Sequence, residues 1–374
     1  MKHAKSGMLR RSRFLILITL TVVCLGFRAE ASELFPRPAS LEPNVRFWVD
    51  VFTAYSYRDF IIHDRDKVWK VYQVLRMPGD GIPTQEDVEW ANDYLKNRYR
   101  TALMHLSTGA PPSDYIERDI VKLFRGEPLK AYAAAADNLR VQQGLKERFR
   151  ETLVRARGYQ PVMERIFRAA GLPIELTLIP SVESGFYTRA RSSAGAVGIW
   201  QFTRSTGRQY LTIRGRRDDR LDPVRSTAAA AKLLNYNYSV LGTWPLAVTA
   251  YNHGTWGMQK ATEVYGDDFP KIVERYDGPH FGFASKNYYA EFLAALQVHQ
   301  YEDKYFPGIK DEVAPPMPKR EPVVRTASLD SGKHGQHHAH RATAVKTHHQ
   351  HRHRHTQRVV LRNTGTRRAS KQRT

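Results

Sequence analysis

Apolar residues recur at helical spacing through most of this chain, and that periodicity is the feature that most restricts its fold. The longest amphipathic segment is TQEDVEWANDYLKNRYRTALMHL, residues 84–106. Thr84 is a favourable N-cap, and acidic residues follow it in the first turn. The alternation of β-branched residues that is typical of half-buried strands is almost absent. The sequence therefore predicts an all-α protein.

Helical patterns also cover the sequence on both sides of this segment. Glycines at positions 171, 242 and 254 are expected to end three of the helices, and Ser226 is expected to cap one of them. Pro180 should disturb the helix that leads to Glu183. The expected helices lie within residues 45–62, 68–75, 128–170, 172–186, 226–242, 244–254 and 285–306.

The first residues have the composition of an export signal. A basic start, MKHAKSGMLRRSR, is followed by the apolar run 14–27, which is short for a bilayer span, and by the small-x-small sequence AEA at 29–31. We predict a signal peptide over 1–31, a mature chain from about Ser32, and a periplasmic location at the cell wall or membrane surface. An uncleaved anchor is the alternative. Cys24, the only cysteine, lies in the apolar run, so no disulfide is expected in the mature chain.

The charge of the chain is concentrated at its C-terminal end. The formal net charge is +21, and residues 333–374 contain eleven Lys or Arg and no Asp or Glu. We predict that 309–374 form a Pro-rich linker and a disordered basic tail. Export and the confinement of charge to one end argue against a nucleic-acid partner.

Histidines are also concentrated in this tail. Clustered imidazoles suit metal ions, a basic tail suits anionic envelope polymers, and a solvated tether is equally compatible with the composition. The histidines are His334, His337, His338, His340, His348, His349, His351, His353 and His355.

A single carboxylate stands out in IPSVESGFYTRARSSAGAVGIWQF, residues 179–202. Glu183 has apolar neighbours, which would raise its pKa and allow it to act as a general acid. The alternative is a glutamate on a solvated helix face. Gly195 and Gly198 permit close approach of a ligand to the backbone, and Gln201 adds a donor and an acceptor.

Four motifs occur in order: ES at 183–184, GAVGIWQF at 195–202, DPVRSTAAAAKLL at 222–234 and AYNHG at 250–254. Together they resemble the soluble lytic transglycosylase (SLT) domain, and most of all its membrane-bound lytic transglycosylase D branch. The resemblance covers roughly 155–305 and extends less specifically to 55–67. It implies a goose-lysozyme-like catalytic domain at 155–308, preceded by a helical N-terminal region at 32–154.

The resemblance implies cleavage of the β-1,4 bond between N-acetylmuramic acid and N-acetylglucosamine in peptidoglycan. The cleavage would give 1,6-anhydromuropeptides, with Glu183 as the sole acid and then base and with no metal or cofactor. A hydrolytic muramidase on the same fold would need a second carboxylate to position water, and the motif region has none. A non-catalytic wall-binding protein is a third possibility. The N-terminal region is expected to extend the glycan groove or to dock a cell-wall synthesis protein.

The family motifs also imply roles for individual side chains. Ser184 would support the Glu183 carboxylate or start the next turn, and Tyr251 would orient Glu183 or belong to the core. Asn252 would hold the local backbone or an acetamido group, or end a helix. Tyr288 would contact substrate, although Ala284 stands where the family often has a glutamate. The expected groove residues are Gly195, Gly198, Ile199, Trp200 and Gln201, and Trp200 or its neighbours would stack on a sugar face.

Other carboxylates near these motifs are interpreted as structural. Glu175 lies at an expected helix start, where the helix dipole favours an anion. The acidic residues Asp218, Asp219 and Asp222 lack the spacing of a metal site and are expected to be loop and capping residues. His253 is expected to have no ligand role.

Overall fold

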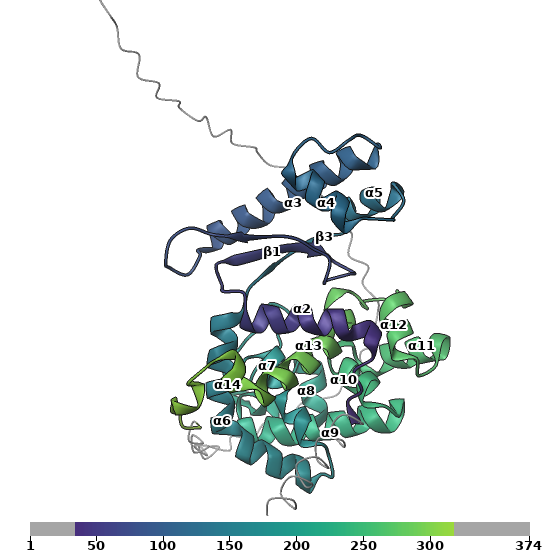
Figure 1. Cartoon of the computed structure of the whole chain (residues 1–374). Coiled ribbons are helices and arrows are strands. Elements are labelled where there is room, and N and C mark those ends of the chain that lie inside the picture. Colours follow the sequence, from purple (N-terminus) through teal and green to yellow (C-terminus); the bar gives the residue numbers. More distant parts are fainter. Residues whose placement is uncertain (1–33, 318–374) are drawn as a thin grey trace, which may run out of the picture. The chain divides into compact units, whose positions relative to one another are not determined.

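The computed structural model describes residues 34–317 (Figure 1). The predicted signal peptide, Cys24, the mature N-terminus near Ser32 and the histidines of the tail lie outside these residues, and those expectations stay predictions. Within 34–317, no helix is both long and apolar enough to cross a membrane.

Helices make up most of the described chain, as the apolar periodicity predicted. The α-helices are α2 (Glu42–Thr53), α3 (Gln85–Ser107), α4 (Tyr115–Leu123), α5 (Lys130–Asp137), α6 (Lys146–Ala169), α7 (Pro180–Glu183), α8 (Arg204–Tyr210), α9 (Pro223–Leu241), α10 (Trp244–His253), α11 (Thr255–Tyr265), α12 (Phe269–Arg275), α13 (Phe283–Gln300) and α14 (Glu302–Tyr305). Short 3-10 helices are η1 (Ala39–Leu41), η2 (Ile174–Leu178), η3 (Asp219–Leu221) and η4 (Ile309–Asp311).

Most of the predicted helix ends agree with the structure. Thr84 caps α3 in a capping box with Asp87, in which each side chain accepts a hydrogen bond from the other residue's backbone. Gly242 follows α9 in the left-handed conformation and Gly254 follows α10. The expected cap at Ser226 is wrong, because α9 begins a full turn earlier at Pro223 and Asp222 is its N-cap.

The region before α6 contains a small sheet that the sequence analysis did not predict. Strands β1 (Asp59–Asp64), β2 (Val71–Arg76) and β3 (Leu139–Gln143) pair antiparallel in the order β2-β1-β3. Helices were expected across these positions, and that expectation is wrong. Every residue of β1 is buried, so the strand shows an apolar run without the alternation that would have identified it.

The sheet separates two hydrophobic cores. Ile61 of β1 belongs to the large core, which contains α2, α6 and α13, whereas Phe60 and Ile62 point into a smaller core under α3, α4 and α5. Figure 1 shows the sheet with α2 on one face and α3 to α5 on the other. The predicted domain boundary between 154 and 155 falls within α6.

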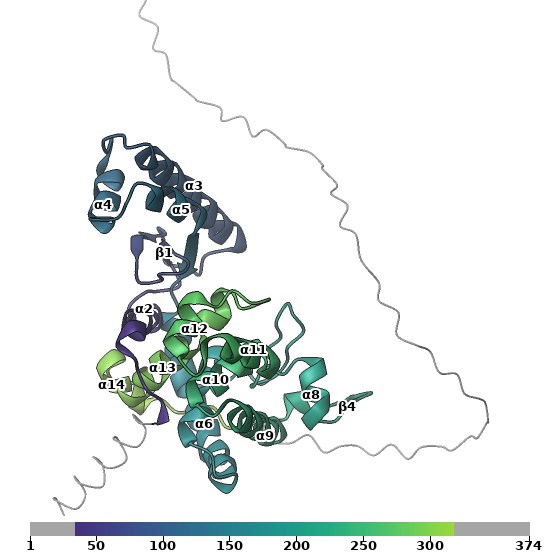
Figure 2. The same cartoon turned by 90° about the vertical axis from the view of Figure 1, so that its right-hand side faces the viewer.

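A second pair of strands is a short hairpin in the helical part of the chain. Strands β4 (Ile213–Arg214) and β5 (Arg217–Asp218) follow α8 directly. Figure 2 shows α8 and this hairpin at the outer edge, away from α2 and α13.

Candidate active site

Glu183 is the last residue of α7, a single turn of helix that begins at Pro180. One helix was expected over 172–186, but the structure divides it into η2 and α7. Pro180 is accepted at the first turn of α7 because that position needs no backbone donor. Ser181 in the same turn shares a hydrogen bond of 2.9 Å with Nε2 of His299 on α13. The carboxylate of Glu183 is therefore carried by a short, anchored turn.

The nearest polar partner of Glu183 is Tyr288 of α13. The Tyr288 hydroxyl donates a hydrogen bond of 2.5 Å to Oε1 of Glu183. After the contact of Ser181 with His299, this is the second hydrogen bond that joins α7 to α13. Although the residue keeps some solvent exposure, its carboxylate is packed within the protein. Burial raises the pKa of Glu183 to about 7, and the hydrogen bond from Tyr288 partly opposes that rise.

A second carboxylate, Glu291, lies within electrostatic reach of Glu183. Burial and the charge of Glu183 raise the pKa of Glu291 to about 8, and Arg140 of β3 opposes this. The sequence analysis missed Glu291 because it lies far along the chain from the ES motif. Its spacing could have revealed it, since Glu291 follows Tyr288 by three residues and shares its side of the helix.

Two polar residues near Glu183 have other partners than expected. The Ser184 hydroxyl donates to the carbonyl of Ile199 at 2.7 Å, so it joins the ES turn to the glycine loop and does not contact the carboxylate. The Tyr251 hydroxyl donates to the carbonyl of Trp200 at 2.8 Å. Tyr288 therefore makes the contact with Glu183 that was expected of Tyr251. Burial and the neighbouring Glu183 charge raise the pKa of Tyr251.

The loop 195–201 is held in a conformation that requires glycine. Gly198 has φ +86°, and a Cβ atom at this position would lie 2.0 Å from the carbonyl oxygen of Arg220. Gln201 also has a positive φ of 47°. Its side-chain amide nitrogen, Nε2, donates to the Gly198 carbonyl at 2.7 Å. This donor is therefore already engaged. The loop is fixed before any ligand arrives, partly in a strained backbone region.

Trp200 belongs to the hydrophobic core and not to a surface. Its side chain is fully buried, stacks on Phe167 at 5.7 Å and donates to Thr227. The expectation that its ring would stack on a sugar is therefore wrong. Ile199 is also buried, and the backbone carbonyls of both residues already accept hydrogen bonds, from Ser184 and Tyr251. The expectation that these two residues line the groove is therefore wrong.

Asn252 lies near the end of α10 and is exposed. Its Oδ1 accepts a hydrogen bond of 2.9 Å from Ser285 of α13. This contact joins the AYN motif to the first turn of α13. Tyr288, which donates to Glu183, lies five residues after the start of the same helix. Neighbouring His253 packs edge-on against Phe281 at 5.0 Å, and burial lowers its pKa.

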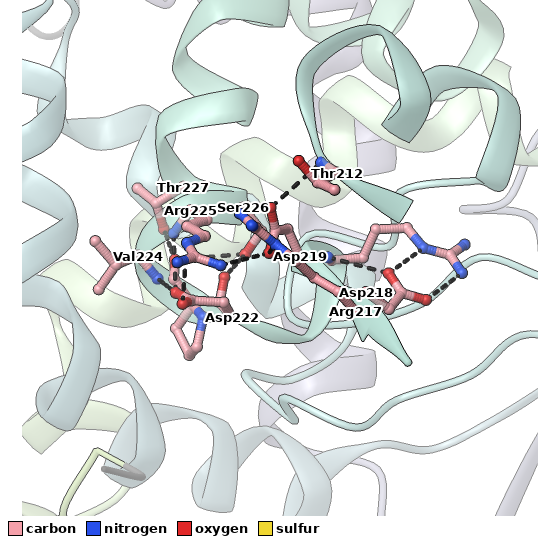
Figure 3. Close-up of polar contacts among 11 residues, drawn as sticks. Thr212, Arg217, Asp218, Asp219, Asp222, Val224, Arg225, Ser226 and Thr227 are labelled. Atoms are coloured by element: carbon pink, nitrogen blue, oxygen red, sulfur yellow. Dashed lines mark hydrogen bonds and ion pairs between the residues drawn. The ribbon is translucent and has the colours of Figure 1, made fainter. Parts of the chain in front are cut away.

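The acidic residues after β4 are structural, as expected. Figure 3 shows Arg217 and Arg225 directed at Asp219, and Asp222 at the start of α9. Arg220 pairs with Asp218 through two hydrogen bonds. Within residues 34–317, no group of three or more His, Cys, Asp or Glu side chains is placed to hold a metal ion.

Part of this chain is similar to a known family. Residues 165–269 match the family model described as the transglycosylase SLT domain. The chain is 37% identical over 147 residues to membrane-bound lytic murein transglycosylase D of Escherichia coli (strain K12). The aligned segment covers 38% of this chain and 32% of that protein. It is also 38% identical over 85 residues to the putative tributyltin chloride resistance protein of Alteromonas sp. (strain M-1). This aligned segment covers 22% of this chain and 41% of that protein.

The chain thus spans about a third of the first of these relatives and two fifths of the second. A solved structure, the 70 kDa soluble lytic transglycosylase from Escherichia coli, aligns with a TM-score of 0.33 at 19% identity, covering 58% of this chain and 34% of that one.

Proposed function

We propose, from the premise that residues 165–269 form a transglycosylase SLT domain, that this protein is a lyase that cleaves peptidoglycan glycan strands without water. The observation that carries the proposal is the Glu183 carboxylate, whose pKa is raised to about 7 in a buried turn with one neutral hydrogen-bond donor. A group with this pKa is present in both protonation states near neutral pH, and a residue that acts first as acid and then as base needs both.

Glu183 would act in two steps. Its protonated form gives its proton to the bridging oxygen between N-acetylmuramic acid and N-acetylglucosamine, and that C–O bond breaks through an oxocarbenium-like state. The carboxylate then takes the proton of the muramic C6 hydroxyl, and the C6 oxygen attacks C1. The product is a 1,6-anhydro ring, Glu183 is protonated again, and no water is consumed.

The Tyr288 hydroxyl would support the charged form of Glu183 between these steps. A hydrogen bond to an ionised acceptor is shorter and stronger than one between neutral groups. The contact of 2.5 Å is already short. Tyr288 is a buried residue of α13, so its hydroxyl is positioned before the charge develops.

Hydrolysis on the same site is the second candidate function, and Glu291 is the observation that favours it. A muramidase needs a second carboxylate that is ionised and able to activate water. The pKa of Glu291 is raised to about 8, so this group is mostly protonated at neutral pH and is a poor base. This protonation favours the lyase reaction over hydrolysis.

The glycan strand would lie along the loop 195–201 and the ends of α10 and α13. Gly195 is exposed, and Asn252 and Gln201 keep polar atoms that make no hydrogen bond within residues 34–317. These groups are suited to acetamido and hydroxyl groups of a sugar. Ser184 and Tyr251 would hold the loop through the carbonyls of Ile199 and Trp200.

The N-terminal region would complete the surroundings of the site. The Arg140 guanidinium of β3 lies 3.8 Å from the ring centroid of Phe283 on α13 and acts on the charge of Glu291. This supports an extension of the groove by the N-terminal region over the docking of a cell-wall synthesis protein. The substrate implies a location in the cell envelope, and export by the predicted signal peptide remains part of the proposal.

The test is a digest of purified sacculi with the protein and with Glu183→Gln, followed by mass spectrometry of the products. We expect anhydromuropeptides from the unmodified protein and none from the variant. Products with reducing ends would contradict this proposal and support a hydrolytic muramidase. Binding of both proteins to sacculi without any product would indicate a non-catalytic wall-binding protein.

A further inference from the structure

The segment 191–225 is rich in arginine, and its arginines divide into two groups. Arg217, Arg220 and Arg225 form ion pairs with Asp218, Asp219 or Asp222, as Figure 3 shows for Arg217 and Arg225 at Asp219. The second group is exposed and has no ion pair with any described residue. We call it the arginine patch; it consists of Arg191, Arg204, Arg208, Arg214 and Arg216.

Four members of the arginine patch line two neighbouring hollows. Arg204, Arg208 and Arg214 line a surface hollow of about 790 Å³ next to α8 and the β4–β5 hairpin. Arg191 and Arg204 line a second hollow of about 560 Å³ together with Gly195. Arg204 belongs to both, so the patch is continuous with the glycine loop that is expected to line the glycan groove.

None of these five guanidinium groups forms an ion pair within residues 34–317, in contrast to Arg217, Arg220 and Arg225. Arginines that stabilise this part of the fold are recognisable by their carboxylates, as Arg217 and Arg225 are. The patch instead gathers like charges, which repel one another. Guanidinium groups suit carboxylates or phosphates, which they bind through paired hydrogen bonds.

We propose that the arginine patch binds the carboxylates of the peptides that the glycan substrate carries. The proposal rests on the proposed function. Peptides attached to the lactyl groups of muramic residues place carboxylates at regular intervals beside a glycan strand. A strand that passes Gly195 would bring those carboxylates over Arg191 and Arg204 and toward Arg208 and Arg214. The patch would thus distinguish peptide-bearing from bare glycan.

The test compares binding to intact sacculi with binding to glycan strands from which an amidase has removed the peptides. The variant replaces Arg204, Arg208 and Arg214 by Gln in the full chain. The matched control replaces Arg118, Arg125 and Arg148, which are exposed and belong to other surfaces, and so changes the net charge equally. Thermal unfolding of both variants verifies that they are folded.

We expect the patch variant to bind intact sacculi about tenfold more weakly, since each exposed charge contact contributes modestly, and to bind bare strands unchanged. The control should bind both as the unmodified protein does, and the difference should shrink as salt is added. An equal loss on both substrates would overturn the proposal, because the patch would then contact sugars.

Two further outcomes are informative. If the patch variant loses binding to phosphatidylglycerol vesicles but not to sacculi, the arginines bind lipid phosphates and the proposal is wrong. Cleavage by the patch variant is measured on bare strands and should be unchanged. If the unmodified protein binds sacculi in a peptide-dependent way but releases no product, the proposed function fails and the patch proposal stands.

Discussion

Carboxylates in two regions of this molecule have opposite environments. Glu183 and Glu291 are enclosed with a tyrosine and a distant arginine, and burial raises the pKa of both. In the network around β5 and η3, hydrogen bonds from Arg220 lower the pKa of Asp218; burial acts to raise that of Asp219, but Arg217 and Arg225 outweigh it. Burial alone therefore does not distinguish the two regions. The presence or absence of a direct cationic partner does.

The difference also explains why one region is suited to chemistry and the other to stability. A buried carboxylate with a neutral donor is held between its two protonation states and can exchange a proton. A carboxylate with two guanidinium partners stays ionised and fixes the geometry around it. The network holds the start of α9 and the backbone of Arg220, against which Gly198 packs.

The largest expected effect comes from Glu183→Gln. Loss of the only proposed acid and base should reduce product release from sacculi about 10³-fold or more. The variant should be as stable as the unmodified protein at pH 8, or more stable, because it removes a buried group that is costly to ionise. Product analysis and thermal unfolding measure the two effects; a large loss of stability at pH 8 would contradict the comparison.

The opposite pattern is expected of Asp219→Asn. Asp219 is 5% exposed and pairs with Arg217 and Arg225, so its loss should reduce the free energy of unfolding by about 3 kcal/mol. Activity of the folded variant should remain. Denaturant unfolding measures this change, and Asp119→Asn, whose ion pair with Lys122 is exposed, should cost less than about 1 kcal/mol.

Tyr288→Phe should change the pH dependence of the reaction. The hydrogen bond from Tyr288 lowers the pKa of Glu183, so its removal should raise that pKa. Activity that requires protonated Glu183 falls as the pH rises through about 7, and this fall should move to higher pH while the maximal rate drops about tenfold. A pH profile of anhydro product release checks it; an unmoved profile would show that the contact has no role in tuning Glu183.

Glu291→Gln should have the smallest effect. The pKa of Glu291 is raised to about 8, so this group is mostly protonated where Glu183 ionises, and its replacement by a neutral amide should leave the fall in activity near pH 7 almost unmoved. The rate below this fall should change less than about tenfold. The same pH profile measures it. A loss of activity as large as that of Glu183→Gln would instead indicate a catalytic role for Glu291.

The stability of the two regions should also respond to pH in opposite directions. The folded pKa of Glu183 is above its ordinary value of 4.5, so its contribution is present below about pH 4.5 and is lost as the pH rises through about 7. The folded pKa of Asp219 is below 3.8, so its contribution is present above pH 3.8 and is lost as the pH falls further. Unfolding of the unmodified protein and Asp219→Asn across pH 3–8 separates the two.

Much of the site could be predicted from sequence because its signals are local. The ES motif, the glycine loop and the AYN motif predicted a resemblance to the SLT family, and a model of that family matches residues 165–269. Thr84, Gly242 and Gly254 end or begin helices through contacts within a few residues. Such contacts depend on backbone geometry that the residues themselves dictate.

The errors concern contacts between residues far apart in the chain. The sheet β1–β3 was missed because β1 is covered on both faces, which removes the alternation of a strand. Trp200 was expected at a surface because a motif tryptophan beside glycines has the same local pattern whether it faces a sugar or Phe167.

The sequence by itself determined the helical character of the chain, its resemblance to the SLT family and the identity of Glu183 as the candidate acid. The tertiary structure alone decided the partners of that acid: Tyr288 in place of Tyr251, and Glu291 as a second carboxylate. The physical reason is that a pKa and a hydrogen bond depend on distance in space. Packing of α7 against α13 brings together residues 105 positions apart, and no local pattern encodes that approach.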